Sequence, residues 1–288
     1  MPTINQCRYS PAARATIKGS PTDRRPPTTG HRPQATGHCR MLLALDVASS
    51  ICTVVLFDPA SDSVLAERVW RTRRRQTEET LPAVSRMMEQ AGVDIDAIDA
   101  VAVTTGPGSF TGVRIGISAV KGIMLGLPQP PRVVGLPVLS VTAARFAPLA
   151  AGAGAAVWPV LQAGRGRFNW APAPLDDPLW LPPVSEHRAG QADELAAALR
   201  TENRPVWLAG ELTDDLRQAV QGLHRVRCID PSPDFDLPAD GRGSALTAQF
   251  GLMESRGESL ARLALRHLRA GSTALTTPLQ PLYLLPPR

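Results

Sequence analysis

The stretch "TTGPGSFTGVRIG" at residues 104–116 has four glycines and one proline in thirteen positions. It follows an apolar run at 99–105 that predicts a strand, and a helical pattern over 113–127 comes after it. A glycine-rich turn between a strand and a helix commonly binds a phosphate through its backbone N–H groups. Alternatively, its missing side chains let two backbone segments come unusually close. The two alternatives predict different functions.

Known phosphate-binding motifs match this turn only in part. A P-loop requires a lysine directly after its last glycine, and no lysine follows Gly112. Gly106, Gly108 and Gly112 are one residue too widely spaced for a dinucleotide-binding fingerprint. A helix N-terminus after a strand is still a general anion site, so these glycines and Asp46 are candidates for cofactor binding.

The packing alternative rests on the helix after the turn. Gly116, Gly122 and Gly126 each cost about 1 kcal/mol relative to alanine inside a helix. Gly112 and Gly116 are four residues apart, as are Gly122 and Gly126, so each pair opens a flat patch on one face of the helix. This spacing predicts that another backbone lies close by, either in the chain's own sheet or in another subunit.

The rest of the first half shows three strands followed by alternating helices and strands. Short turns join the three apolar runs, which predicts an antiparallel meander. Thr77 is the expected N-cap of the next helix, and Gly92 ends it. The alternation that follows has the βαβ rhythm of a parallel sheet, so a mixed sheet is expected. The predicted elements are strands from Met41 and at 51–58, 63–70, 99–105 and 132–135, with helices at 77–91, 113–127 and 138–147.

A segment of small residues at 147–156 marks the expected boundary between two lobes, over 41–148 and 149–288. Beyond it, a hairpin that turns at Gly164–Gly166 is followed by alternating helices and strands. The second half thus repeats the first imperfectly. Its predicted elements are the hairpin at 156–173, helices at 191–200, 212–221, near 244–255 and at 257–270, and strands at 205–209 and 225–229.

Residues 1–40 have a different composition, with six prolines and no Leu, Val, Phe or Trp. Such a segment buries too little apolar surface to offset its ordering entropy. We expect a disordered or mis-assigned N-terminal extension, with Met41 as the true start. Six arginines and one lysine against Asp23 give it a charge of +6, and since the whole chain carries +5, residues 41–288 carry −1. Bulk charge therefore does not make the folded part a nucleic-acid binder.

Composition also argues against several kinds of site. The sequence has no run of 18 apolar residues, so no membrane-spanning helix is expected. None of the four cysteines belongs to a CxxC motif, and reduced thiols are expected. No two of the five histidines are four residues apart, as a pair of metal ligands on one helix face would be. We therefore expect no bound metal.

Four segments resemble, in order and spacing, the bacterial TsaB (YeaZ) family. They are "MLLALDVASSICTVVLFD" from residue 41, "TEETLPAVSRMMEQAG" from 77, "TTGPGSFTGVRIGISAVKGIMLG" from 104 and "VVGLPVLSVTAARF" from 133. The sequence "PLYLLPP" near the C-terminus is similar to the family's "PLYLR" ending. The resemblance covers about 41–148 strongly and the remainder weakly.

The resemblance implies an α/β fold of two related actin-like lobes (ASKHA, ribonuclease H-like), each a mixed sheet flanked by helices. It also implies a non-catalytic subunit that dimerises with and activates a TsaD-type enzyme. That enzyme forms N6-threonylcarbamoyladenosine (t6A) at position 37 of tRNAs reading ANN codons. Further implied partners are a TsaE-type ATPase and, through the complex rather than directly, tRNA. We expect no cofactor, a cytoplasmic location, and a homodimer when the protein is alone.

The family's dimer interface is formed by two helices that correspond here to 77–91 and 112–127. The resemblance therefore favours a neighbouring subunit as the reason for the glycine spacing. On these two helices we expect the interface residues to come from the apolar stripes, together with one glycine: Leu81, Val84, Met88, Val113, Gly116, Ile117, Val120 and Met124.

The alternative function is a stand-alone ATPase or kinase of the actin-like superfamily. Its nucleotide would bind at a DxGxT turn after the first strand, where this chain has Asp46–Ser50 with Ala48 in place of the glycine. Asp46 then either orients a metal-bound water or caps the turn. The four arginines within Arg71–Arg75 either contact tRNA phosphates or form a solvated surface.

Overall fold

The computed structural model describes most of the chain after residue 39. The described residues are 40–73, 75–229, 255–272 and 279–284. The expected N-terminal extension, apart from Arg40, lies outside them. The helix expected near 244–255 also lies outside them, apart from Ser255.

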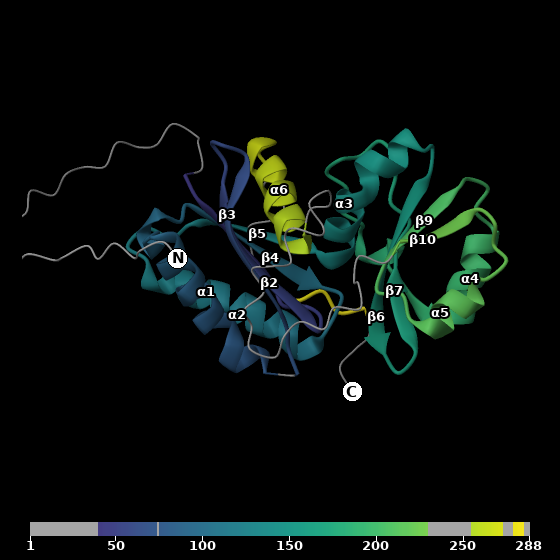
Figure 1. The fold of residues 1–288 in the computed structure, drawn as a ribbon, viewed down its shortest axis with the longest axis horizontal. Helices are drawn as coiled ribbons and strands as arrows, with labels where there is room; N and C mark the ends of the chain where they lie inside the picture. Colours follow the sequence, from purple (N-terminus) through teal and green to yellow (C-terminus); the bar gives the residue numbers. More distant parts are fainter. Residues whose placement is uncertain (1–39, 74, 230–254, 273–278, 285–288) are drawn as a thin grey trace, which may run out of the picture. The chain divides into compact units, whose positions relative to one another are not determined.

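A five-stranded mixed sheet, the first sheet, has the strand order β3-β2-β1-β4-β5 (Figure 1). Its first three strands form the predicted antiparallel meander, whereas β4 runs parallel to both β1 and β5. Helices cover both faces, so the central strands are buried and consist mainly of apolar residues. The strands are β1 Leu42–Asp46, β2 Ile51–Asp58, β3 Ser63–Arg71, β4 Ala100–Gly106 and β5 Arg132–Pro137.

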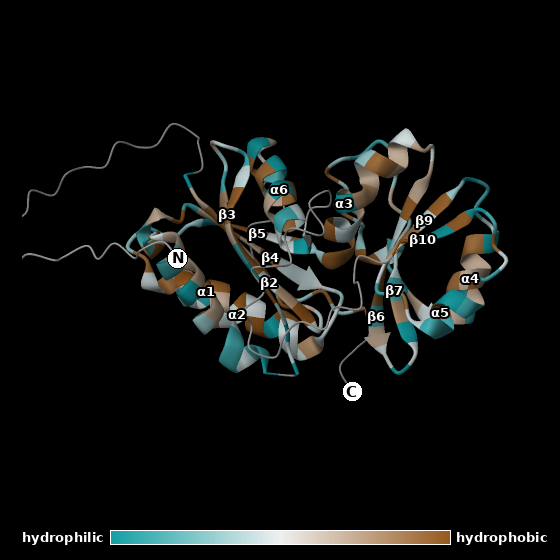
Figure 2. Cartoon of the chain, viewed as in Figure 1, coloured by the Kyte–Doolittle hydropathy of each residue, from teal (hydrophilic) through white to brown (hydrophobic). Residues whose placement is uncertain are grey.

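Two long helices, α1 (Gln76–Ala91) and α2 (Phe110–Gly126), pack on one face of the first sheet and against each other (Figure 1). Val84 and Val120 from these helices join strand residues in one apolar core. In Figure 2, hydrophobic colours are concentrated in the strands that these helices cover. Burial of that apolar stripe fixes the helices on the sheet.

The second sheet repeats this topology, with the strand order β10-β9-β6-β7-β8. β6, β7 and β8 form an antiparallel meander, and β9 runs parallel to both β6 and β10. This repeat confirms the expected fold of two related α/β lobes, each a mixed sheet flanked by helices. The elements are β6 Ala156–Gly164, β7 Arg167–Trp170, β8 Arg188–Gln191, α4 Ala192–Arg200, β9 Val206–Gly210, α5 Asp214–Ala219 and β10 Val226–Ile229, with short 3-10 turns at Ile95–Ala97 and Val184–Glu186.

The last described helix of each half packs on the sheet of the other half. α3 (Val138–Gly152) follows β5 but makes its most extensive contacts with β6. α6 (Arg256–Arg269) lies beyond the boundary predicted after residue 148, yet it packs on β1 and β2. Its Leu260 belongs to the same apolar core as Leu42. The two helices also contact each other, so this exchange joins the two sheets.

Three arginines of α6 bind groups in the β1–β2–β3 part of the first sheet that are far away in the sequence. These contacts tether the helix to the sheet that it covers. The pairs are Arg256 with Asp46, Arg262 with Asp62, and Arg269 with the carbonyl oxygen of Pro59.

The beginning of α1 differs from the prediction. The helix starts at Gln76, so Thr77 lies inside the first turn and is not the N-cap. The residue before the helix is Arg75, whose carbonyl oxygen accepts a hydrogen bond from the N–H of Glu78 at 3.0 Å. No side chain caps this end. Glu78 and Glu79 lie in the first turn, near the positive end of the helix dipole, which favours acidic side chains.

The start of α2 also differs, and one strand was not predicted. α2 begins at Phe110, three residues before the predicted start at 113. Ser109 is its N-cap, and its Oγ accepts a hydrogen bond from the N–H of Gly112 at 3.2 Å. β8 was missed because the four-residue sequence "RAGQ" has no apolar alternation.

Candidate functional site

The glycine-rich turn between β4 and α2 lies against the turn that follows β1. A side chain on Gly108 or Gly112 would overlap the backbone carbonyl group of Ala48 or Val47, respectively. The N–H of Ser109 donates a hydrogen bond to the carbonyl oxygen of Ala48 at 2.7 Å. Two backbone segments of the same chain therefore meet here, and their close approach requires glycine.

The first glycine of the turn faces the C-terminal segment 279–284. A Cβ atom on Gly106 would lie 2.8 Å from the carbonyl oxygen of Leu282. The N–H of Leu282 donates a hydrogen bond to the carbonyl oxygen of Thr105 at 2.7 Å. All three glycines considered for cofactor binding thus face the chain's own backbone, which favours the packing alternative over phosphate binding.

Asp46 is buried at the end of β1, and both of its carboxylate oxygens have partners in the chain. Oδ1 accepts hydrogen bonds from the N–H of Ala48 at 3.1 Å and from the hydroxyl of Thr104 at 2.9 Å. Oδ2 forms an ion pair with Arg256, which also donates to the hydroxyl of Ser49 at 2.7 Å. Asp46 therefore caps the turn and binds an arginine. In a site that hydrolyses a nucleotide, this carboxylate would instead have to orient a metal-bound water.

Two further titratable groups lie near this ion pair. Burial raises the pKa of the Cys52 thiol to about 12, and the charge of Asp46 adds to the rise, so the thiol stays protonated. Burial also raises the pKa of Glu211, and the guanidinium of Arg256 opposes that rise. In the described part of the chain, no group of three or more His, Cys, Asp and Glu side chains has the arrangement to hold a metal ion. Arg256 pairs with Asp46 and is close enough to Glu211 for its charge to affect the pKa of that carboxyl group.

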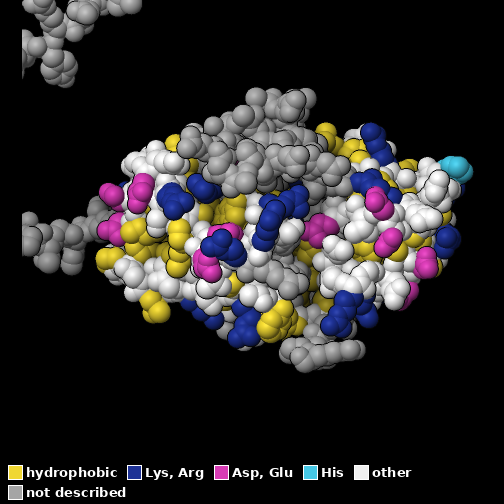
Figure 3. Space-filling model, turned by 60° about the horizontal axis from the view of Figure 1, so that its bottom comes forward, with side chains coloured by type: hydrophobic (Ala, Val, Ile, Leu, Met, Phe, Trp, Pro, Cys, Tyr) yellow, Lys and Arg dark blue, Asp and Glu magenta, His cyan; other side chains and the backbone are white. Residues whose placement is uncertain are grey.

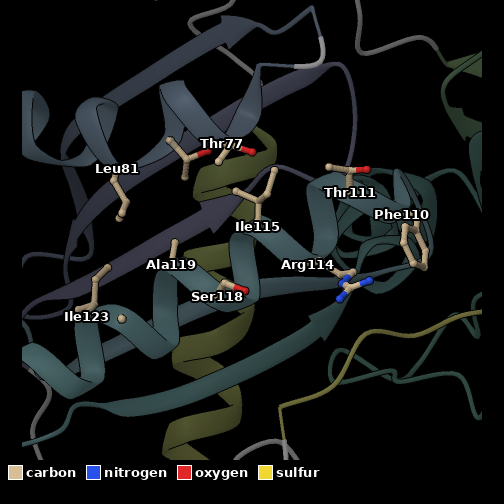
Figure 4. A pocket seen from close by; sticks show the side chains of 11 residues that line it. Thr77, Leu81, Phe110, Thr111, Arg114, Ile115, Ser118, Ala119 and Ile123 are labelled. Atoms are coloured by element: carbon tan, nitrogen blue, oxygen red, sulfur yellow. The ribbon is translucent and has the colours of Figure 1, made fainter.

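An open groove of about 690 Å³ lies between α1 and α2 (Figure 4). Figure 4 shows Leu81 of α1 pointing toward Ala119 and Ile123 of α2, with Phe110 at the end where α2 begins. The groove is lined by Thr77, Thr80, Leu81, Phe110, Thr111, Arg114, Ile115, Ser118, Ala119, Gly122 and Ile123.

Large apolar side chains are exposed along this groove and beside it. Leu81 is 49% exposed and Phe110 is 44% exposed, and Leu125 near the end of α2 is 89% exposed. A Cβ atom on Gly122 would meet no atom within 4 Å, so the helix backbone is open to a neighbour there. In Figure 3, hydrophobic side chains reach the surface between charged ones on the half at the left, which belongs to the first sheet and its helices. Exposed apolar surface that is concentrated in one place is typical of interaction sites.

Most of the predicted interface residues do not reach this surface. Leu81 is exposed and Met124 is half-buried. The other six are buried in the chain's own core: Val84, Met88, Val113, Gly116, Ile117 and Val120. The prediction took the most apolar stripe of each helix, and that stripe packs on the chain's own sheet. The exposed groove uses the neighbouring face, whose mixed threonine, serine and isoleucine content gives a weaker sequence signal.

The two glycine pairs of α2 also have different surroundings. A Cβ atom on Gly116 would lie 2.9 Å from the side chain of Val47. Val47 is also the residue whose backbone carbonyl group a Cβ atom on Gly112 would overlap. Gly122 and Gly126 face open space. The chain's own β1 turn therefore explains the first pair, and only the second pair leaves a flat patch for another molecule.

Comparisons with known proteins agree with these observations. The TsaD family model, described as tRNA N6-adenosine threonylcarbamoyltransferase, matches residues 64–173, which include both helices of the groove. The tRNA threonylcarbamoyladenosine biosynthesis protein TsaB of Haemophilus influenzae is 33% identical over 102 residues, and that of Escherichia coli is 37% identical over 89 residues. Over this part, the chain is similar to TsaB (YeaZ) proteins. The matched segments span 35% and 31% of the chain, and 40% and 37% of the two relatives, so the chain matches less than half of either relative's length.

A solved structure extends the likeness over both sheets. YeaZ from Pseudomonas aeruginosa superposes with a TM-score of 0.59 at 21% sequence identity, covering 84% of this chain and 99% of that chain. At this identity the match shows the fold alone, which is the expected pair of α/β lobes, each a mixed sheet flanked by helices. None of the helices in the described residues is long and apolar enough to span a membrane.

Proposed function

We propose that this chain is a non-catalytic subunit of a tRNA-modifying complex. In this proposal it pairs with a TsaD-type enzyme and activates it to form t6A at position 37 of tRNAs reading ANN codons. The observation that carries the proposal is the exposed apolar groove between α1 and α2, which lies within the segment that matches the TsaD family model. The names of the curated TsaB relatives supply the modification pathway.

A paralogous partner suits the groove. Two chains of the same fold present equivalent helix pairs, so they can associate through one approximately symmetric layer of four helices. Gly122 lets the backbone of a partner helix approach closely, because no atom of this chain lies near its missing side chain. Leu81 and Phe110 supply exposed apolar contacts from α1 and from the start of α2.

A non-catalytic role fits the surroundings of Asp46. Its buried carboxylate is paired with Arg256 and accepts two further hydrogen bonds from the chain. Ala48 occupies the glycine position of the superfamily's nucleotide turn, and its Cβ atom would lie 3.1 Å from a Cβ atom on Gly108. This part of the chain is therefore packed against itself where the catalytic relatives of the fold bind phosphate.

The proposal includes the remaining partners. The chain works with a TsaE-type ATPase in the same complex and reaches tRNA through the complex. When its partner is absent, it pairs with itself through the same groove, because an apolar surface of this size is better buried than solvated. The complex acts in the cytoplasm.

Mass spectrometry of tRNA nucleosides after depletion of the chain in its source organism tests the proposed pathway. We expect t6A to fall as the chain is depleted and to return when the wild-type chain is supplied. Unchanged t6A after complete depletion would contradict the proposal.

Calorimetry of the isolated chain with ATP and magnesium tests the non-catalytic role. Steady ATP turnover by the chain alone would show that role to be wrong.

A further inference from the structure

The C-terminal segment 279–284 runs from the apolar core to one end of the α1–α2 groove. Leu279 packs, half-buried, against two of the apolar cores. Leu282 is held by the hydrogen bond from its N–H to the carbonyl oxygen of Thr105, at 2.7 Å. Tyr283 follows directly, and its ring stacks on Phe110 with centroids 5.1 Å apart and an interplanar angle of 27°. Two anchored leucines thus bring an aromatic ring to the groove.

Phe110 receives a second contact from the groove itself. The guanidinium carbon of Arg114, one helical turn further along α2, lies 5.2 Å from the centroid of the Phe110 ring. Phe110 and Arg114 both line the groove, whereas Tyr283 is not among its lining residues. Tyr283 therefore acts on the groove through Phe110, because it limits the positions that an exposed phenylalanine at a helix start can take.

The charge at this end of the groove is unbalanced. Arg114 is the one charged residue among the described residues that line the groove. It is exposed, and it forms no salt bridge with any residue that the structure describes. A guanidinium on an aromatic ring beside an apolar groove is complementary to a carboxylate flanked by apolar side chains.

We propose that segment 279–284 is a strap that completes the docking groove. Tyr283 holds Phe110, and Phe110 with Arg114 receives an acidic side chain on an apolar helix of the TsaD-type partner. This inference rests on the proposed function and names a positioning residue, Tyr283, and the chemistry of the partner surface. Neither the helix stripe nor the glycine spacing indicates this end of the groove.

The affinity of full-length variants for the purified TsaD-type partner tests the strap. Tyr283→Ala should weaken binding roughly 3- to 10-fold, since an aromatic pair contributes about 0.5–1.5 kcal/mol. Tyr283→Phe keeps the ring and should bind like the wild type. Arg114→Gln should weaken binding and reduce its dependence on salt, because the exposed ion pair is lost.

Double variants distinguish a role of Tyr283 in positioning Phe110 from a general loss of the fold. Phe110→Leu keeps an apolar side chain but removes the stack and the ring beneath Arg114, so it should cost at least as much affinity as Tyr283→Ala, and the double variant should cost no more than Phe110→Leu alone. The effect of Arg114→Gln should also shrink when Tyr283 is alanine. Thermal unfolding midpoints should stay near that of the wild type.

Three results would overturn the strap. The first is that the Tyr283→Ala variant binds the partner as tightly as the wild type does, a result that would leave the proposed function intact. Another is a loss in Tyr283→Phe as large as in Tyr283→Ala, because the ring would then not matter. The third is strictly additive losses for Tyr283 and Phe110. If the wild-type chain itself does not bind the TsaD-type partner, the strap and the proposed function both fail.

Discussion

The helix pairs α1–α2 and α4–α5 occupy equivalent places in the two repeats but differ in length. α1 and α2 have 16 and 17 residues, whereas α4 and α5 have nine and six. Both pairs bury apolar residues on their own sheets, such as Val120 in the first and Leu195 in the second. Within the described residues, the large exposed apolar side chains on these four helices all lie on α1 or α2. Burial of a core thus explains the second pair completely, and the first pair has surface left for another role.

The inner faces of the two pairs should respond alike to a buried charge. Val120→Glu on α2 and Leu195→Glu on α4 each place a carboxylate at a position with no exposed surface. Each should lower the free energy of unfolding by more than about 4 kcal/mol, as chemical denaturation would show. Lys121→Glu, at an exposed neighbouring position, should change it by less than about 0.5 kcal/mol. A folded Val120→Glu chain that fails only to bind its partner would place Val120 at the interface and break the comparison.

The exchanged helix α6 should stabilise the first sheet more than the second. Arg256→Met leaves the buried Asp46 carboxylate without its cation and should cost about 3 kcal/mol. Arg262→Met removes a pair with Asp62, whose side chain is 62% exposed, and a pair with Glu258 one helical turn away, and should cost about 1 kcal/mol because neither carboxylate is left fully buried. Hydrogen exchange after Arg256→Met should rise in β1 and β2 before it rises in β6. Equal costs for the two arginines would contradict the assigned role of the buried pair.

The glycines of α2 should divide into two classes. Gly112→Ala forces a Cβ atom onto the backbone of Val47 and should lower the free energy of unfolding by about 2 kcal/mol. Gly122→Ala meets no atom and removes a poor helix former, so it should raise stability by up to about 1 kcal/mol. Thermal unfolding of the two variants shows whether each substitution raises or lowers stability. A loss of stability in Gly122→Ala would show that this position also serves the chain's own packing.

The topology of each half could be predicted from the sequence because short local patterns indicate its strands, turns and helices. Apolar runs joined by short turns predict the meanders, and the glycine-rich turn separates β4 from α2. The exchange of α3 and α6 was not predicted, because amphipathic periodicity shows that a helix has an apolar face but not which sheet receives it. Arg256 and Asp46 are 210 residues apart, so no local pattern joins them.

The groove lies on helices that the sequence pointed to, and its role as an interface stays a prediction. The two helices are those that the resemblance implied, and the flat patch at Gly122 follows from the glycine spacing. The predicted interface residues came from the apolar stripes of the two helices. When a helix packs on a sheet, its most apolar stripe faces that sheet, so most of these residues are buried in the chain's own core. Phe110 was missed because the helix was expected to begin at 113. Tyr283 was missed because its contact with Phe110 depends on the path of the C-terminal segment.

The most direct measurement of the central claim is the affinity of the chain for the proposed TsaD-type partner when a charge is added to one helix pair or to the other. Gly122→Glu places a carboxylate on the open face of α2, and Ala197→Glu places one on an exposed position of α4. We expect Gly122→Glu to weaken binding at least 100-fold, or about 2.7 kcal/mol, with the chain still folded. Ala197→Glu should bind within about 3-fold of the wild type, a difference of less than about 1 kcal/mol. Gly122→Ala should weaken binding, but less than Gly122→Glu, because its methyl group fills the space that the partner backbone approaches. Wild-type affinity in Gly122→Glu would contradict the account, because the surface that distinguishes the two helix pairs would then have no part in association.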